Sequence, residues 1–180
     1  PNILEKKYWN LNKNDQFNKN HSYSFYKKQT DTILKKSVQL QTLSDVPIGC
    51  FLSGGIDSSY IVKNMFDRGK EVNTFSIVLE DKKYDERKWS REVSKKYNTN
   101  HTEVELGLTD FEDNVLDSIN FIDEPYADPS TVPSFVISKN ISSQYKTSIS
   151  GDGGDELIGG YKRTNYLLFR NKKIKSFLKY

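Results

Sequence analysis

The chain contains the segment Val46-Pro47-Ile48-Gly49-Cys50-Phe51-Leu52-Ser53-Gly54-Gly55-Ile56-Asp57-Ser58-Ser59. Its first half is a short apolar run, which is typical of a buried strand. The two adjacent glycines allow the backbone to bend tightly and to approach a ligand closely. The residues after them open a helix, and the first N–H groups of a helix have no partner inside it. The segment therefore predicts a strand, a tight turn and a helix N-terminus that can bind an anion.

The rest of the sequence alternates between strand-like and helix-like stretches. We expect helices over residues 23–43, 60–66, 85–97, 109–121 and 133–145, and strands over 46–52, 72–79, 101–106 and 147–150. This alternation predicts an α/β fold, a Rossmann-like parallel sheet with helices on both faces. Ligands of such sheets bind at the carboxyl ends of the strands. Both glycine turns of the sequence fall at such ends.

The composition argues against several classes of protein. The 180 residues fit one domain, 35% of them are hydrophobic, and the net charge of +3 is too mild to indicate nucleic-acid binding. Nucleic acid is therefore not an expected partner. No apolar run approaches the roughly 20 residues that span a membrane, so a membrane is not an expected partner either. Cys50 is the only cysteine, which excludes an intrachain disulfide. A cytoplasmic location is therefore expected.

Asp57 is the unusual residue of the first glycine turn. A carboxylate beside a phosphate site repels the ligand unless a cation such as Mg²⁺ bridges the two. The alternative interpretation is a helix N-cap, because Asp is favoured at that position without any ligand. The turn lacks the Gly-Lys-Ser/Thr ending of a Walker loop and the third glycine of a dinucleotide fingerprint.

A second glycine turn follows the last predicted strand, with the sequence Ser150-Gly151-Asp152-Gly153-Gly154-Asp155-Glu156. Its carboxylates repel one another unless a cation or a polar ligand is present. A Ca²⁺-type acidic loop or a solvated turn is the alternative, although the spacing does not match an EF-hand. Taken together, the two turns predict one site in which Asp57 and Asp155 hold Mg²⁺ on pyrophosphate. Asp152 would stay free beside the reacting acyl group.

At this point the motifs resemble a known family. Residues 46–59 resemble the PP-loop of glutamine-hydrolysing asparagine synthetases. Three further stretches match the family in order: Thr74-Phe75-Ser76-Ile77, Asp123-Glu124-Pro125-Tyr126-Ala127-Asp128-Pro129-Ser130, and Ser150-Gly151-Asp152-Gly153-Gly154-Asp155-Glu156-Leu157. The resemblance implies a fold of the PP-loop ATP pyrophosphatase type. It also implies a reaction: ATP adenylates the side-chain carboxylate of aspartate, pyrophosphate leaves, and ammonia attacks the acyl adenylate to give asparagine and AMP.

The resemblance further implies roles for the matching residues. Asp57 and Asp155 would be the Mg²⁺ ligands. Asp152 would support formation of the aspartyl adenylate and the attack of ammonia, and Glu124 would act on the substrate side together with Asp128. ATP and its pyrophosphate would be bound by Phe51, Ser53, Gly54, Gly55, Asp57, Ser58, Ser59, Ile77, Ser150 and Gly151. Of these, Phe51 and Ile77 would hold the adenine through main-chain groups, and Ser150 and Gly151 would contact AMP.

The resemblance also implies the domain organisation. Residues 1–22 would be an irregular lead-in from an N-terminal glutaminase domain, and residues 23–180 would be part of the synthase domain. Family members place a Cys nucleophile at the start of the glutaminase domain and a catalytic Lys well beyond the last matching motif. No residue of this sequence matches either position. The expected partners are aspartate, ammonia, the glutaminase domain and a second copy in a homodimer.

Other functions fit the same motifs. A related synthetase could adenylate a carboxylate on a sugar, a peptide or another amino acid, and a nucleotide-binding module could keep the fold without turnover. A tRNA-modifying PP-loop enzyme fits less well, because it would need a more basic surface. We expect His101 to be structural and Cys50 to be a small buried apolar residue.

Overall fold

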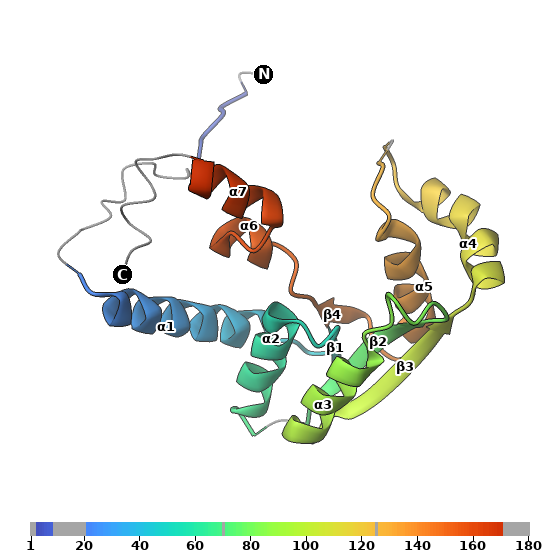
Figure 1. Ribbon diagram of the computed structural model, residues 1–180, viewed down its shortest axis with the longest axis horizontal. Coiled ribbons are helices and arrows are strands. Elements are labelled where there is room, and N and C mark those ends of the chain that lie inside the picture. The colour runs from blue at the N-terminus through green and yellow to red at the C-terminus, as the bar shows by residue number, and fades with distance from the viewer. Residues whose placement is uncertain (1–2, 9–20, 70, 125, 171–180) are drawn as a thin grey trace. The chain divides into compact units, whose positions relative to one another are not determined.

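The computed structural model describes residues 3–8, 21–69, 71–124 and 126–170, without the side chains of residues 165 and 168–170 (Figure 1). Most of the predicted lead-in, residues 9–20, lies outside this description, as do residues 171–180. The chain divides into two compact units, Pro1–Lys36 and Ser37–Tyr180. In the first unit, residues 3–8 are irregular and the larger part of helix α1 (Tyr23–Gln41) follows. Asp31 and Lys35, one turn apart on α1, form an ion pair at 2.7 Å.

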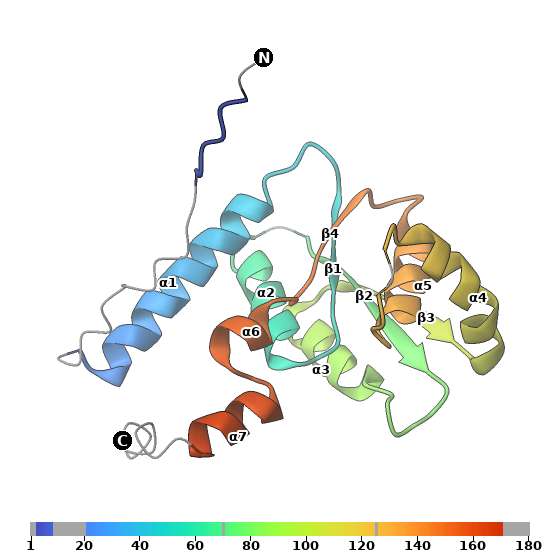
Figure 2. The same ribbon diagram turned by 90° about the horizontal axis from the view of Figure 1, so that it is seen from above.

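The second unit is built on a four-stranded parallel sheet (Figure 2). Its strands are β1 (Ile48–Phe51), β2 (Asn73–Leu79), β3 (Asn100–Leu106) and β4 (Thr147–Ile149), in the order β3-β2-β1-β4. The chain first moves outward from β1 to β3 and then returns to the other side of β1 to form β4. The strand order therefore reverses between β1 and β4. In open parallel sheets, ligands bind outside the carboxyl ends of the strands at this reversal.

Helices cover both faces of the sheet, which confirms the predicted α/β fold. Helices α2 (Ile56–Phe66) and α3 (Arg87–Tyr97) lie on one face, and α5 (Thr131–Ile141) lies on the other, with α4 (Leu108–Phe121) packed against α5 (Figures 1 and 2). Two short helices follow β4, namely α6 (Gly154–Ile158) and α7 (Lys162–Arg170). The sequence had not predicted these two.

The core consists of one apolar cluster on each face of the sheet. Cys50 and Leu52 point toward α2, whereas Phe51 between them packs toward α5, because successive side chains of a strand point to opposite faces. The α2 side buries Val38, Cys50, Leu52, Val62, Met65 and Val72. The α5 side buries Phe75, Val104, Leu106, Val132, Val136, Ile137 and Ile141. Burying each of these large side chains fully stabilises the fold by about 1.5–3 kcal/mol.

Three helices begin earlier than the sequence predicted. Helix α2 begins at Ile56 rather than at residue 60, directly after the glycine pair. Helix α5 begins at Thr131, so Pro133 lies in its first turn. The N–H groups of a first turn have no partner inside the helix, so the N–H that proline lacks costs no hydrogen bond there. Helix α4 begins at Leu108, because the N–H of Gly107 donates to the Asp110 carboxylate at 3.1 Å and fixes the cap one residue earlier.

The helical spacing of Phe111, Val115, Leu116 and Ile119 predicts that they form one apolar side of α4, and this prediction is partly wrong. Val115 packs against the core cluster under α5, as expected. Leu116 and Ile119, however, are 72% and 57% exposed, while Ser118 is only 1% exposed. Ser118 can be buried because its hydroxyl donates to the carbonyl of Val115 at 2.8 Å within the helix. Apolar spacing alone did not show which stripe of α4 faces α5.

Candidate functional site at the carboxyl ends of β1 and β4

The first glycine turn is held against the start of α3. Gly54 has a φ of +85°, a left-handed conformation that favours glycine. A methyl group on Gly54 would also lie 2.5 Å from the carbonyl carbon of Trp89 and 2.6 Å from the amide nitrogen of Ser90. Both the backbone conformation and the space therefore require glycine at this position.

The turn ends at the N-terminus of α2. Gly55 is the N-cap, in an extended conformation and without a side-chain cap. The N–H of Ser59 donates to the Gly55 carbonyl at 3.0 Å, which is the first bond of the helix. Asp57 lies in the first turn and is not the N-cap, so the capping interpretation of this residue is wrong. A negative charge in the first turn is favoured by the helix dipole.

Three serine hydroxyls surround this helix N-terminus. Ser53 Oγ and Ser58 Oγ lie 3.1 Å apart, and the N–H of Gly55 donates to Ser53 Oγ at 3.2 Å. Ser59 Oγ is buried and has no hydrogen-bond partner among the described residues. Leaving a buried polar atom unsatisfied costs about 1–3 kcal/mol. A ligand oxygen or a water at this end of α2 would remove that cost.

The two glycine turns are in direct contact. A methyl group on Gly151 would lie 3.0 Å from Asp57 Cβ and 3.1 Å from the amide nitrogen of Ser58. A methyl group on Gly154 would lie 2.6 Å from Asp57 Cγ. The pairing of β1 with β4 places the turns side by side, since each turn follows the carboxyl end of its strand. The structure thus brings the two motifs together, through a strand order that was not predicted from the sequence.

The acids of the second turn point in different directions. Asp152 is exposed, and its Oδ2 accepts a hydrogen bond from Ser150 Oγ at 2.8 Å. The Asp155 carboxylate lies against Gly160. Glu156 accepts a hydrogen bond from the Tyr161 hydroxyl at 2.6 Å. The structure therefore gives the Asp155 carboxylate Gly160 as a neighbour.

The predicted substrate-side residues lie before α5. Glu124 is exposed. The Tyr126 hydroxyl donates to Asp128 at 3.3 Å. The pKa of Tyr126 is raised, first by the negative charge of Asp128 and by the hydrogen bond to it, and to a smaller extent by the charge of Asp152.

A cleft of about 260 Å³ extends from the first turn along the ends of β1 and β2. It contains three of the predicted site residues, Phe51, Ser53 and Ile77. Residues that the sequence did not single out as site residues also line it, among them Tyr84, Glu86, Pro133 and Ser134. Their position in the chain was the available signal, because they follow β2 or begin α5 and so face the same edge of the sheet. The pKa of Glu86 is raised by partial desolvation of its carboxyl group.

Comparisons with known proteins show the family to which the chain belongs. The family model for asparagine synthase matches residues 29–178. The chain belongs to the asparagine synthase family. Over 152 residues it is 37% identical to the putative asparagine synthetase [glutamine-hydrolyzing] 2 of Methanocaldococcus jannaschii, covering 82% of this chain and 29% of that relative. Over 134 residues it is 31% identical to asparagine synthetase [glutamine-hydrolyzing] 1 of Bacillus subtilis, covering 74% of this chain and 21% of that relative.

The chain spans less than a third of the length of these curated asparagine synthase relatives. Among solved structures, the NMN synthetase of Francisella tularensis is similar with a TM-score of 0.48 and 14% identity, over 78% of this chain and 59% of that one. No helix in the described part of this chain combines the length and the apolar composition that crossing a membrane requires.

Metal binding can be judged from the donors that the asparagine synthase fold presents here. Within residues 3–8, 21–69, 71–124 and 126–170, no three Asp, Glu, His or Cys side chains converge on a possible metal position. A complete protein cage is therefore absent from the described residues. Mg²⁺ commonly binds through one or two carboxylates together with substrate phosphates and waters. Asp57, beside the helix N-terminus and the orphaned Ser59 hydroxyl, fits that second kind of site.

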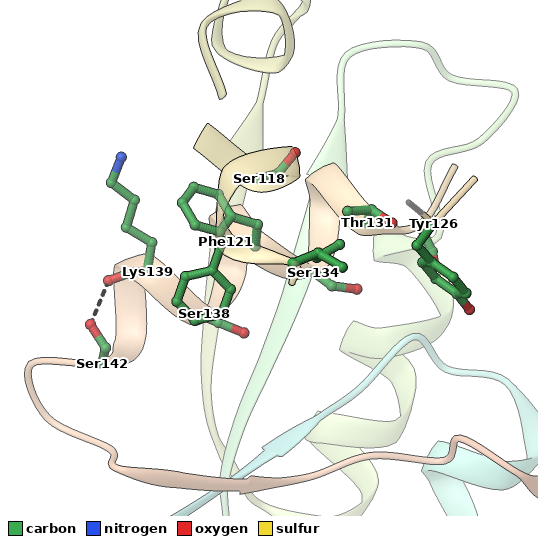
Figure 3. Close-up of a pocket in the computed structure, with 11 residues that line it drawn as sticks. Ser118, Phe121, Tyr126, Thr131, Ser134, Ser138, Lys139 and Ser142 are labelled. Atoms are coloured by element: carbon green, nitrogen blue, oxygen red, sulfur yellow. Dashed lines mark hydrogen bonds between the residues drawn. The ribbon is translucent and has the colours of Figure 1, made fainter. Parts of the chain in front are cut away.

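A larger pocket, of about 570 Å³, lies between α4 and α5 (Figure 3). Phe121 and Tyr126 contribute aromatic rings to it, and serines along α5 contribute hydroxyls. Its one lysine, Lys139, is already bonded to Asn114 at 3.3 Å and lies 3.6 Å from Asp117. The pocket shares Ser134 with the cleft but contains no residue of either glycine turn. In this member of the asparagine synthase family, the carboxylates and the helix N-terminus of the candidate site therefore lie at the glycine turns and not in this pocket.

Proposed function

We propose that this chain is the nucleotide-binding part of an ATP-dependent amide synthetase that converts aspartate and ammonia into asparagine. The contact between Asp57 and Gly154 is the observation that carries this proposal. It joins a helix N-terminus suited to an anion with an acidic turn, at the reversal of strand order where parallel sheets bind ligands.

The first turn would hold the leaving pyrophosphate. Adenylation of a carboxylate by ATP breaks the bond between the α- and β-phosphates, and negative charge grows on the pyrophosphate as it leaves. Donors that are already in place stabilise such charge without reorganising. The proposed donors are the first amides of α2 and the hydroxyls of Ser53, Ser58 and Ser59. The tight Gly54-Gly55 bend lets the backbone approach the phosphates.

Mg²⁺ is part of the proposal because Asp57 would otherwise repel the phosphates. When bound, the ion would neutralise phosphate charge and help the pyrophosphate to leave. Asp57 is the ligand that the geometry favours. Asp155 is the proposed second ligand, and its side chain would have to turn away from Gly160 to serve.

The nucleoside would lie in the 260 Å³ cleft. Ser53 belongs both to the pyrophosphate turn and to the cleft lining, so base and phosphates can occupy one continuous site. Main-chain groups of Phe51 and Ile77 would hold the adenine. Ser150 and Gly151 would contact the AMP portion, which is consistent with the position of Gly151 beside the amide of Ser58.

Asp152 is the proposed general base for the attack of ammonia, with Glu124 on the substrate side. Asp152 is exposed, and Ser150 orients one of its oxygens while leaving the other available. A general base must reach the proton that it removes within hydrogen-bond distance. Relatives are named as glutamine-hydrolysing, so we expect a glutaminase domain in the full-length protein to supply the ammonia.

The test is a product analysis of the full-length protein with Mg²⁺, ATP and ammonia and with aspartate, glutamate or other carboxylic acids as acceptors. We expect asparagine, AMP and pyrophosphate in equal amounts when aspartate is the acid supplied, and no amide from the other acids. Amide formation with another acid would reassign the acceptor, and nucleotide binding without any product would favour a module without turnover. We also expect a cytoplasmic homodimer, which imaging and size-exclusion chromatography would test.

A further inference from the structure

A group of polar side chains is buried between β2, β3 and α3. Thr74 and Ser90 are fully buried, and Ser76 is 5% exposed. His101 on β3 lies at the centre of this group. Its Nδ1 is 2.9 Å from Thr74 Oγ1, and its Nε2 is 3.2 Å from Ser76 Oγ. Neutral histidine donates from one ring nitrogen and accepts at the other, so both hydroxyls can bond to an uncharged ring.

Two branches leave the imidazole of His101. The Nδ1 branch continues from Thr74 to Thr99 at 2.8 Å and from Thr99 to Ser94 at 3.0 Å, toward the C-terminal half of α3. The Nε2 branch continues from Ser76 to Ser90 at 3.4 Å, in the first turn of α3. Both branches therefore end on the same helix, one turn apart.

Only the Nε2 branch reaches the candidate site. The backbone of Ser90 is the surface against which Gly54 packs, with 2.6 Å between the Ser90 amide nitrogen and a methyl group placed on Gly54. Ser76 also lines the nucleotide cleft, whereas neither Thr74 nor Ser94 does. The hydroxyl of Ser90 donates to the carbonyl of Arg87 at 3.1 Å, which further fixes the first turn of α3.

We propose that His101 is a positioning residue for the pyrophosphate turn. Through Ser76 and Ser90 it holds the first turn of α3 in the place that Gly54 requires. Gly54 has no side chain of its own to fix the turn, so the shape of the turn depends on the α3 backbone against which Gly54 packs. Removing one member of a buried polar network leaves its partners unsatisfied and lets them rearrange. The inference rests on the proposed function, because it assigns a role in binding pyrophosphate.

The first test compares Ser90→Ala with Ser94→Ala in the full-length protein. The substitutions are identical, lie one turn apart on α3 and remove buried hydroxyls of the same network. The measurement is the Kd of inorganic pyrophosphate with Mg²⁺ by titration calorimetry, together with the melting temperature. We expect Ser90→Ala to weaken binding about tenfold, equivalent to about 1.4 kcal/mol. Ser94→Ala should stay within about twofold of the unmodified protein while losing a similar amount of thermal stability.

The second test uses His101 itself and remains informative if Ser90→Ala does not fold. Glutamine can place its amide near the position of Nε2, whereas asparagine can place its amide near Nδ1. We expect His101→Gln to retain most of the pyrophosphate affinity and His101→Asn to lose about tenfold, again about 1.4 kcal/mol. Equal affinities within each pair of variants would overturn the positioning role while leaving the proposed function intact. Absence of pyrophosphate binding by the unmodified protein would overturn both.

Discussion

Gly154 lies against the carboxylate of Asp57, so closely that a methyl group on Gly154 would be 2.6 Å from Asp57 Cγ. The two residues are almost a hundred positions apart in the sequence and belong to different glycine turns. Neighbouring parallel strands, β1 and β4, bring them together. The absence of a side chain at residue 154 gives the Asp57 carboxylate its room.

Gly154→Ala should therefore displace the Asp57 carboxylate. We expect pyrophosphate affinity to fall at least tenfold, measured by calorimetry with Mg²⁺ on the full-length protein. Gly154 begins α6, and alanine is a better helix former than glycine, so the expected loss comes from the displaced carboxylate and not from the helix. Glu156→Ala in the same helix is the control, since that side chain bonds to Tyr161. Unchanged affinity in Gly154→Ala would show that the carboxylate does not need its position.

Gly54→Ala and Gly69→Ala should separate backbone strain from crowding. Both glycines have positive φ, +85° and +69°, but a methyl group on Gly69 would meet nothing within 4 Å. Gly69→Ala should cost about 1–2 kcal/mol of stability. Gly54→Ala should cost about 1–3 kcal/mol more, because it also forces the start of α3 to move. Denaturant unfolding measures both values, and equal losses would contradict the packing of Gly54 on Trp89 and Ser90.

The Cys50 thiol should be inert in the folded protein. It is completely buried, and burial raises its pKa to about 12. Only the thiolate reacts readily with alkylating reagents. We expect the peptide that contains Cys50 to remain unlabelled at pH 8 until the protein is denatured, as followed by mass spectrometry. Because the folded pKa is raised, this residue favours the fold below pH 9, and that contribution is lost as pH rises toward 12. Labelling at the rate of a free thiol would contradict the burial.

The sequence was sufficient for the α/β class and the parallel sheet, although not for α6 and α7, because its strongest signals are local. The glycine pair after an apolar run marked both the end of β1 and the start of a helix. The parallel sheet followed from the alternation of strands and helices, and it predicted both turns at the carboxyl edge. These are consequences of backbone geometry, which single-sequence patterns report well. That β1 and β4 are neighbours, so that the turns meet, comes only from the structure.

Side-chain directions were less accessible. The spacing of Leu116 and Ile119 on α4 predicted burial, but only the position of α5 decides which stripe of α4 is covered. The direction of Asp155 toward Gly160 depends on the left-handed turn at Gly159, and no pattern in the acidic segment reports it. The hydroxyls around His101 lie up to 27 residues from it along the chain, so their network becomes visible only when β2, β3 and α3 are assembled.

His101 should make the fold more stable at neutral than at acidic pH. Its pKa is lowered, first by burial, and the nearby Glu103 carboxylate offsets only part of that effect. A lowered pKa means that the folded state resists protonation. The contribution of His101 is therefore complete above about pH 6.5 and is lost as pH falls below that value. The melting temperature should drop less between pH 7.5 and 5.5 in His101→Gln than in the unmodified protein. His21→Gln, at an exposed position, should behave like the unmodified protein; identical pH profiles for all three would contradict the role of burial.

The most direct measurement of the pyrophosphate site is isotope exchange in the full-length protein. Labelled pyrophosphate is incubated with ATP, Mg²⁺ and aspartate in the absence of ammonia, so label enters ATP only if a carboxylate is adenylated reversibly. We predict exchange by the unmodified protein and a loss of about 100-fold or more in Asp57→Asn, equivalent to about 2.7 kcal/mol or more of transition-state stabilisation. Asp67→Asn, at the other end of α2, should exchange normally. Formation of amide and ADP without any exchange, or full exchange by Asp57→Asn, would contradict the assignment of pyrophosphate to the paired glycine turns.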